Sequence, residues 1–498
     1  MKDDEILHFL KANEQSLPIL LFVFFILFVL PLLYFYRKTK KVTSRQSTRP
    51  KGDPQKFASD LVESSDRTEA LQDLITNTKY LKEDEDLIFC MDLDFFQKNV
   101  DELKEAFPKN TLHGIAVKAN PATGFLKYSQ ELGLGAEVAS LVELKQAIRC
   151  GFSPEKIVFD SPAKTRNEIV HALKLGVTLN VDNLQELETV RDVLAELKEK
   201  SGSLVGMRIN TQHGAGDIQA TSTATLTSKF GVAIRRHREE IIRSFAKYEW
   251  LNGVHAHGGS QGCSLQLLVE GARILMDLVQ EINQVREENG YPKLCFVDIG
   301  GGIPTDYSSV RPSNLFQRYA QMLRKEVPEL FQSQHRVITE IGRALVVNAG
   351  WSIARVKYVK ATGASDKNAN QRYTIAITDY GADCDVRNSY MPGVWHRRVN
   401  VYRPNGQLKD TRHLQLTDIV GPLCFSGDLL VKGRRLPSIT KGDLVMIHNT
   451  GGYTLAMWSR YNSRCAPMMV GYTAINKSFK WQVLKSKEKQ ERVLEFWD

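Results

Sequence analysis

The stretch GIAVKANPATGFLKYSQELGLGAE, residues 114–137, contains the pattern that decides the fold. A short apolar run ends in Lys118, a helical pattern follows, and a second short run ends in Glu137. Such runs occur eight times between residues 114 and 343. The other six end at Asp160, Asp182, Arg208, His257, Asp298 and Glu340. Eight strand and helix units predict an α/β fold, a (β/α)8 TIM barrel, in which catalytic groups collect at the carboxyl ends of the strands.

Three consecutive glycines, Gly300–Gly302, follow the seventh run. Glycines let backbone amides approach a phosphate closely, and barrels commonly bind phosphate in the loops after strands seven and eight. A Rossmann dinucleotide site is the alternative, but the GxGxxG spacing of that fingerprint is absent. A tight turn or a barrel phosphate site therefore remains.

Beyond residue 350 the pattern changes to alternating segments separated by turns, such as YTIAITDYG at 373–381 and DLVMIHNTGGY at 443–453. This pattern predicts a second, all-β, barrel-like domain. The predicted organisation is an N-terminal tail (1–16), a transmembrane helix (17–36), a basic flexible linker (37–80), a barrel (95–349), a β domain (81–94 plus 350–475) and a charged tail (476–498).

Residues 17–36 read LPILLFVFFILFVLPLLYFY and contain no charge. A helix of this length spans about 30 Å, the thickness of a bilayer core. A cleaved signal peptide and a buried core helix are the alternatives, and the long apolar run followed by basic residues disfavours both. The positive-inside rule then predicts a single-pass membrane protein whose catalytic domain faces the cytosol.

The net charge of +9 is concentrated beside this segment. Eight of the 66 basic residues and one of the 57 acidic residues lie at 37–56, which leaves 58 and 56 elsewhere. The rest of the chain is nearly neutral, which argues against nucleic acid as a partner and favours contact of the basic segment with anionic lipid. The seven cysteines contain no CxxC pair, so a reducing compartment is expected and no metal site is predicted.

Six ordered motifs carry a resemblance to a known family. They are AVKAN (116–120), GVHAHGGSQG (253–262), VDIGGGIP (297–304), TEIGR (339–343), DIVGPLCFSGD (418–428) and GGYTLAMWSRYNSR (451–464). On these motifs the chain resembles the fold type III pyridoxal phosphate decarboxylases, the group of diaminopimelate, ornithine and arginine decarboxylases. The resemblance covers roughly residues 85–475, and the last two motifs are closest to the diaminopimelate branch.

The resemblance implies pyridoxal 5'-phosphate as cofactor, held by Lys118 through a Schiff base. A lysine in a partly desolvated pocket is expected to lose its proton readily. Glu340 would face the pyridine nitrogen and keep it protonated, which favours decarboxylation over racemisation. His257 would lie flat against the cofactor ring.

Further site residues follow from the same resemblance. The residues expected to bind the phosphate and its surroundings are Ser260, Gly300, Gly301, Gly302, Gly342, Arg343 and Tyr453. Arg208 and Lys229 also match the family, without an assigned role. Cys424 matches the thiol that protonates the substrate α-carbon, and in the family this cysteine reaches the cofactor of the neighbouring subunit. The resemblance therefore implies a homodimer with shared active sites.

The chain departs from the family next to Cys424. Diaminopimelate and ornithine decarboxylases carry an acid there for the distal ammonium of the substrate, whereas this chain has Phe425. We therefore expect a substrate without a distal amine, with Phe425 facing an apolar or aromatic side chain. The other expected substrate contacts are Arg343, Asp379, Arg387, Tyr390 and Tyr453. Asp379 keeps a diamine-forming substrate open, and Arg387 keeps recognition of a distal carboxylate open.

These features predict a membrane-tethered amino acid decarboxylase, a carboxy-lyase that releases CO2 through a Schiff base and a quinonoid. Its expected partners are a small amino acid, a second copy of the chain and a membrane contacted through residues 17–36. Two alternatives remain. One is a catalytically inactive regulatory homologue similar to antizyme inhibitors, and the other is a racemase or decarboxylase of a conjugated amino acid.

Overall fold

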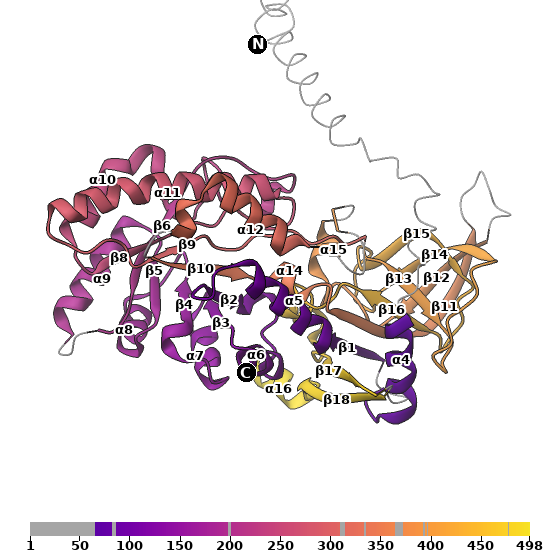
Figure 1. Cartoon of the computed structure of the whole chain (residues 1–498). Coiled ribbons are helices and arrows are strands. Elements are labelled where there is room, and N and C mark those ends of the chain that lie inside the picture. The colour runs from indigo at the N-terminus through magenta and orange to yellow at the C-terminus, as the bar shows by residue number, and fades with distance from the viewer. Residues whose placement is uncertain are drawn as a thin grey trace, which may run out of the picture. The chain divides into compact units, whose positions relative to one another are not determined.

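Figure 1 shows the computed structural model of the chain. The structure describes residues 65–81, 86–197, 201–308, 314–332, 335–363, 372–391, 394–395, 397–476 and 478–498. These residues belong to one compact unit, Asp60–Asp498, and form two nine-stranded sheets. One sheet is a closed barrel, and the other forms a second domain.

Eight parallel strands make the barrel. They are β2 (Leu112–Ala116), β3 (Gly135–Val138), β4 (Ile157–Asp160), β5 (Thr178–Val181), β6 (Val205–Asn210), β8 (Leu251–His255), β9 (Phe296–Asp298) and β10 (Arg336–Ile341). Each strand pairs with the next one in this series, and β10 pairs with β2, which closes the barrel. The short β7 (Val232–Ala233) extends the sheet beside β6. The predicted eight-stranded barrel is confirmed.

Helices precede, connect and follow the barrel strands. They are α5 (Leu93–Ala106), α6 (Thr123–Glu131), α7 (Leu141–Arg149), α8 (Arg166–Leu175), α9 (Leu184–Glu196), α10 (Ile234–Lys247), α11 (Leu265–Glu288), α12 (Leu315–Glu326), α13 (Glu329–Gln332) and α14 (Arg343–Val346). The bounds of α8 show how the local sequence sets them. Thr165 and Glu168 form a capping box at its start, and Gly176 ends it with φ of 79°.

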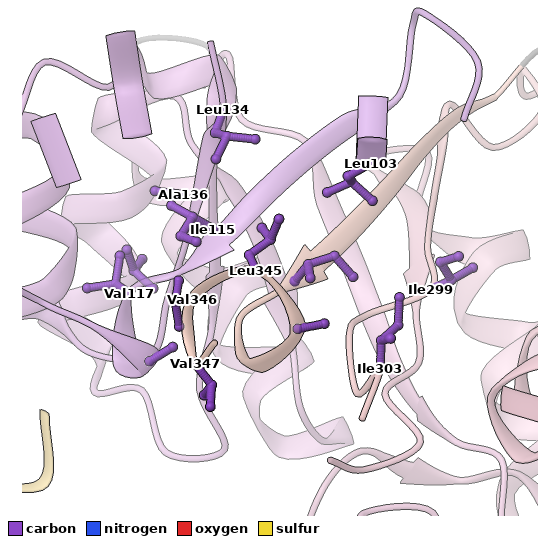
Figure 2. Close-up of a cluster of buried hydrophobic side chains, with 14 of the residues drawn as sticks. Leu103, Ile115, Val117, Leu134, Ala136, Ile299, Ile303, Leu345, Val346 and Val347 are labelled. Atoms are coloured by element: carbon purple, nitrogen blue, oxygen red, sulfur yellow. The ribbon is translucent and has the colours of Figure 1, made fainter. Parts of the chain in front are cut away.

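The polar residues predicted at strand ends do not all lie within the strands. β2 ends at Ala116, so Lys118 lies in the following 3-10 turn, η3 (Val117–Ala119). β8 ends at His255, which is fully buried, and His257 lies in the loop beyond it. In Figure 2, Val117 beside the lysine and Ile299 and Ile303 around the glycine turn belong to one buried hydrophobic cluster. This shared core fixes the two segments on the same end of the barrel.

The second sheet combines segments from both ends of the described chain. Its strands are β1 (Leu87–Asp92), β11 (Gly350–Gly363), β12 (Arg372–Thr378), β13 (Val399–Tyr402), β14 (Leu414–Val420), β15 (Leu429–Pro437), β16 (Leu444–His448), β17 (Met468–Ile475) and β18 (Ser478–Lys485). β1 pairs antiparallel with β11 and parallel with β17, so the segment before the barrel joins the domain after it. Two short helices, α15 (Val386–Tyr390) and α16 (Gln490–Glu495), accompany the sheet, and β18 and α16 lie in the range predicted as a charged tail.

A helix, α4 (Ser65–Asn77), lies in the range predicted as a flexible linker and packs on the second sheet. Its Arg67 is 3% exposed and donates a 2.5 Å hydrogen bond to the carbonyl of Asn348. Arg67 also contacts the Nδ1 atom of His448 at 2.8 Å. A buried guanidinium with these partners ties the helix to the sheet.

The predicted membrane attachment is corrected. Among the helices that the structure describes, none combines the length and the apolar character needed to cross a bilayer. The predicted span itself, residues 17–36, lies outside the described residues. We therefore do not propose a single-pass membrane localisation, a membrane partner or a tethered catalytic domain.

Candidate active site

Lys118 and Glu137 meet at the ends of the neighbouring strands β2 and β3. The Lys118 ammonium donates hydrogen bonds to both carboxylate oxygens of Glu137, which is fully buried. Burial acts to lower the pKa of Lys118, but the carboxylates of Glu137 and Glu340 outweigh it, and the pKa lies above its ordinary value. The expectation that this pocket strips the proton from Lys118 is therefore corrected: without another group present, the lysine is held as an ammonium.

Glu137 is a site residue to which the sequence assigned no role. Burial raises its pKa above the ordinary value of a glutamate, although the nearby Lys118 ammonium opposes this effect. A carboxylate with a raised pKa is a stronger base than an exposed one. Its position at the end of β3, next to the strand that precedes Lys118, was the signal available in the sequence.

Glu340 lies at the end of β10 and faces into the barrel. Both of its carboxylate oxygens are buried and lack a hydrogen-bond partner among the described residues. The Nε2 atom of His255 lies 3.4 Å from Glu340 Oε2, and the Nδ1 atom of His255 lies 3.5 Å from Asp160 Oδ1. Asp160 in turn accepts a 2.6 Å hydrogen bond from Nη1 of Arg208.

The sequence reasoning missed His255 and listed Asp160 only as a strand end. The signal for His255 was its place two residues before His257, which puts both side chains at the same strand end. Arg208, which had no assigned role, contacts Asp160 and lies 4.5 Å from the ring centroid of Phe230. The exposed Lys229 lies 5.1 Å from the same centroid.

His257 is held as a neutral ring. The backbone N–H of Gly259 donates a 3.1 Å hydrogen bond to its Nδ1 atom, which therefore acts as an acceptor. Burial lowers the pKa of His257 to about 3, with further lowering by Arg208 and Lys118 against the opposing effect of Glu340. An uncharged imidazole suits stacking against an aromatic ring that itself carries a positive charge.

Arg343, the first residue of α14, is the centre of the expected phosphate site. Its Nε donates to Ser260 Oγ at 3.2 Å, and its Nη1 donates to Tyr307 Oη at 2.6 Å. Its Nη2 is buried and has no hydrogen-bond partner among the described residues. The guanidinium lies 4.2 Å from the ring centroid of Tyr453, and Gly342 packs beside the Tyr453 hydroxyl. The structure thus brings Ser260, Gly342, Arg343 and Tyr453 together.

The glycine turn after β9 contributes fewer free amides than expected. Gly300 and Gly302 have φ of 64° and 97°, a region that favours glycine. The Gly300 N–H donates a 2.9 Å hydrogen bond to Asp298 Oδ1, so it is already used. The backbone N–H groups of Gly301 and Gly302 have no acceptor among the described residues, which leaves these two for a phosphate.

A prediction follows for Gly301→Ala. An added Cβ would lie 2.0 Å from the carbonyl oxygen of Glu340, so the turn and the Glu340 backbone would have to separate. We expect cofactor affinity, measured by near-visible absorbance during titration with pyridoxal phosphate, to fall roughly 10- to 100-fold, the cost of 1 to 3 kcal/mol of overpacking. Gly202→Ala is the matched control because an added Cβ there has no heavy atom within 4 Å. Equal affinities for the two variants would contradict the prediction.

Arg387, from α15, forms a wall of the site with two aromatic rings. Its guanidinium lies 5.0 Å from the ring centroid of Tyr453 and 5.5 Å from that of Trp395. Its Nη1 is buried without a hydrogen-bond partner among the described residues. Burial and the nearby Arg343 lower its pKa. A half-buried guanidinium with an unpartnered N–H has the chemistry to bind a carboxylate. Trp395 is a further wall residue that the sequence reasoning missed.

Asp379 is brought near charges of the opposite sign. Its carboxylate lies 2.8 Å from Lys357 Nζ and 3.2 Å from Arg464 Nη2. Lys357 also pairs with Asp86 at 3.2 Å and Arg464 with Asp383 at 2.8 Å, so Asp379 belongs to a network of ion pairs and is a poor partner for a substrate ammonium.

Cys424 is exposed in the second domain, and Phe425 beside it is half-buried. The backbone N–H of Cys424 donates a 2.9 Å hydrogen bond to Asn462 Oδ1, and the Cys424 carbonyl accepts one from Tyr461 Oη. Phe425 stacks on Tyr390 with centroids 5.5 Å apart and meets Tyr461 edge-on at 6.2 Å. Within the described part of the chain, this aromatic group has no recorded contact with Lys118 or Glu340.

The unpartnered groups fit the expected cofactor. Glu340 has two buried oxygens that make no hydrogen bond among the described residues, and only Oε2 faces His255, which leaves Oε1 to suit the protonated ring nitrogen of pyridoxal phosphate. Arg343 Nη2 and the amides of the glycine turn are donors without acceptors, which suits a phosphate dianion.

Comparison with known proteins bears on the family to which the chain belongs. A family model described as "Pyridoxal-dependent decarboxylase, pyridoxal binding domain" matches residues 93–347. The chain is 30% identical over 382 residues to a diaminopimelate decarboxylase of Helicobacter pylori (strain J99), covering 76% of this chain and 87% of the relative. It is 32% identical over 361 residues to that of Pseudomonas fluorescens, covering 71% and 80%.

A solved structure is similar as well. The crystal structure of diaminopimelate decarboxylase from Helicobacter pylori in complex with L-lysine superposes with a TM-score of 0.70 at 28% identity. The superposition covers 83% of this chain and 97% of that structure, so the likeness extends over both domains.

Proposed function

The chain belongs to the family of pyridoxal-dependent decarboxylases, and we propose that it acts within that family on an amino acid without a distal amine. It is a pyridoxal phosphate-dependent amino acid decarboxylase, a carboxy-lyase. The narrower proposal rests on one observation. Phe425, which stacks on Tyr390 and meets Tyr461 edge-on, stands where the resembling enzymes carry an acid for the distal ammonium.

Residues of this chain match three polar parts of the cofactor: the aldehyde, the ring nitrogen and the phosphate. When bound, pyridoxal phosphate supplies an electron sink for the electron pair left behind as CO2 departs. Lys118 would hold it through the ε-amine, and Glu340 would accept the hydrogen bond of the ring nitrogen. Ser260, Arg343 and the amides of Gly301–Gly302 would hold the phosphate.

Lys118 and Glu137 handle the first proton. The lysine must be uncharged to act as a nucleophile, and its ammonium is hydrogen bonded to Glu137. Because burial raises the pKa of Glu137, this carboxylate can accept the proton and keep it within reach for its return.

The second proton must reach the substrate α-carbon after CO2 has left. We assign its delivery to the Cys424 thiol, a general acid on the exposed surface of the second domain. Since this surface has no recorded contact with Lys118 among the described residues, the proposal includes a homodimer in which Cys424 and Phe425 complete the site of the second copy.

The charges around the substrate position favour a carboxylate over an amine. Asp379 is paired with Lys357 and Arg464, and Phe425 offers only an aromatic face. Arg387, in contrast, keeps a buried N–H without a partner. We therefore propose that the substrate side chain is apolar, aromatic or acidic, with an acidic group binding Arg387.

The test is CO2 release from a panel of apolar, aromatic, acidic and basic L- and D-amino acids. We expect lysine, ornithine and diaminopimelate to react at least about tenfold more slowly than the preferred substrate, because no free carboxylate meets their distal ammonium, an interaction of roughly 1.5 to 3 kcal/mol. In Phe425→Glu this deficit should shrink by a similar factor.

Phe425→Gln is the matched control, since it removes the aromatic ring without adding charge. A wild-type preference for lysine, ornithine or diaminopimelate would refute the substrate proposal while leaving the decarboxylase class intact. Reaction only with an amino acid joined to a carrier would favour a conjugated substrate. Absence of CO2 release from every substrate, in protein that retains the cofactor, would favour the regulatory alternative.

A further inference from the structure

A chain of four charged side chains crosses the barrel beneath the expected cofactor site. Arg208 (β6) donates to Asp160 (β4), Asp160 faces Nδ1 of His255 (β8), and Nε2 of His255 faces Glu340 (β10). The distances along the chain are 2.6, 3.5 and 3.4 Å. Each member is at most 5% exposed, so no bulk water screens the contacts.

We propose that Arg208, Asp160 and His255 form a relay that keeps Glu340 ionised and oriented toward the ring nitrogen of the cofactor. His255 and Asp160 are then positioning residues for decarboxylation. The inference rests on the proposed function, because Glu340 has this task only when the cofactor is present.

The relay explains how the buried Glu340 can stay ionised. A fully buried glutamate ordinarily takes up a proton, and a protonated Glu340 could not keep the ring nitrogen charged. Burial acts to raise the pKa of Glu340, but His255 outweighs it and the pKa lies below its ordinary value. Burial likewise acts to lower the pKa of His255, but Glu340, Asp160 and Asp298 outweigh it, so the imidazole is held as a cation.

Asp160 needs its own partner for the same reason. Burial would raise its pKa, and Arg208 and His255 hold it below the ordinary value instead. Asp298 (β9), the remaining acid that faces the histidine, has a pKa well above its ordinary value because of burial and Glu340. The signs of the charges alternate along the relay from Arg208 to Glu340.

A metal ion is the competing explanation, since donor atoms of Asp160, His255 and Glu340 all lie within 4.8 Å of one another. The guanidinium of Arg208, 2.6 Å from Asp160, already supplies a cation at this position. A metal would also engage Glu340, which must stay free for the cofactor. The relay accounts for the same residues without this conflict.

The test uses the holoenzyme and the variants His255→Gln and Asp160→Asn, both close in size to the native residues. His113→Gln is the matched control, because His113 is a buried barrel histidine whose Nδ1 lies 2.8 Å from Thr339 Oγ1 and whose ring meets Phe107 edge-on. The decisive readout is the 15N NMR signal of cofactor labelled at the ring nitrogen. We expect the protonated position in wild type and His113→Gln, and a shift toward the unprotonated position in the two relay variants.

Kinetics give a second readout. We expect kcat to fall roughly 10- to 100-fold in His255→Gln, with a smaller change in KM, as is typical when a residue that orients a functional group is removed. In Asp160→Asn the pKa of His255 should fall because a negative neighbour is gone. We expect kcat to fall at high pH as His255 loses its proton. This fall should move to lower pH in Asp160→Asn but not in His113→Gln.

The outcomes separate the relay from the function. Wild-type protein without near-visible cofactor absorbance would refute the proposed function itself. A protonated ring nitrogen and unchanged pH profile in both folded relay variants, with wild type active, would refute the relay alone. Stoichiometric metal in the wild-type holoenzyme that His255→Gln loses would also overturn it. If His255→Gln fails to fold, Asp160→Asn decides by the same measurements.

Discussion

Lys118→Ala is expected to remove the near-visible absorbance of the bound cofactor and to lower CO2 release by at least about 10³-fold. The reason is that no other lysine lies at this strand end, so the nucleophile that would hold the cofactor is lost. Absorbance spectra of the purified variant incubated with pyridoxal phosphate, together with CO2 release, measure the effect. Lys109→Ala, at an exposed lysine elsewhere on the barrel, should behave as wild type.

The same variant has a second consequence for stability. Glu137 loses its cation, so burial should raise its pKa further. A carboxyl whose folded-state pKa lies above its unfolded value stabilises the fold below the unfolded pKa, and this contribution is lost as pH rises through the folded pKa. The Tm of Lys118→Ala should therefore fall relative to wild type as the pH rises from about 5 to 8. In the double variant that also carries Glu137→Gln, this decrease of Tm with pH should disappear.

These results would be contradicted by cofactor absorbance that survives in Lys118→Ala. A variant that loses absorbance but keeps full CO2 release would also contradict the role of this lysine. Because the double variant with Glu137→Gln carries no unpaired buried charge at this place, it separates loss of the nucleophile from loss of folding.

Cys424→Ala is expected to keep the cofactor and its absorbance but to lower the rate of CO2-releasing turnover roughly 10²- to 10⁴-fold, the usual contribution of a general acid. The thiol is on the exposed surface of the second domain, so its loss leaves no cavity and should not change the Tm. Cys295→Ala, at another exposed cysteine, is the matched control and should retain activity.

Mixing the two inactive variants tests the shared site. If Cys424 serves the site of the second copy, a mixed dimer of Lys118→Ala and Cys424→Ala contains one site with both native residues. Equal mixing and reassociation should then restore about a quarter of wild-type activity, since half of the dimers are mixed and each has one intact site. Activity that stays at the level of the separate variants would place Cys424 and Lys118 in the same copy.

The barrel and much of the site could be predicted because their signals are local in the sequence. Eight apolar runs ending in polar residues specify eight strands, and the carboxyl ends of parallel strands meet at one end of a barrel. Lys118, Glu340 and Arg343 follow from motifs with fixed spacing. The membrane prediction also came from a local pattern, but no described helix supports it.

The partners of those residues could not be predicted in the same way. His255 and Asp160 are 95 positions apart in the numbering of the chain, and no spacing rule connects β4 with β8. The use of the Gly300 amide by Asp298 and the pairing of Asp379 with two cations are likewise contacts between elements that only packing brings together.

The sequence by itself determined the strand order, the polar strand ends and the family, because each depends on residue type and spacing along the chain. Only the tertiary structure decided the charge states: Lys118 as an ammonium on Glu137, His257 as a neutral ring, and His255 as a cation between two carboxylates. The physical reason is that a buried charge depends on its nearest opposite charge and on the water excluded around it, and both are set across the barrel.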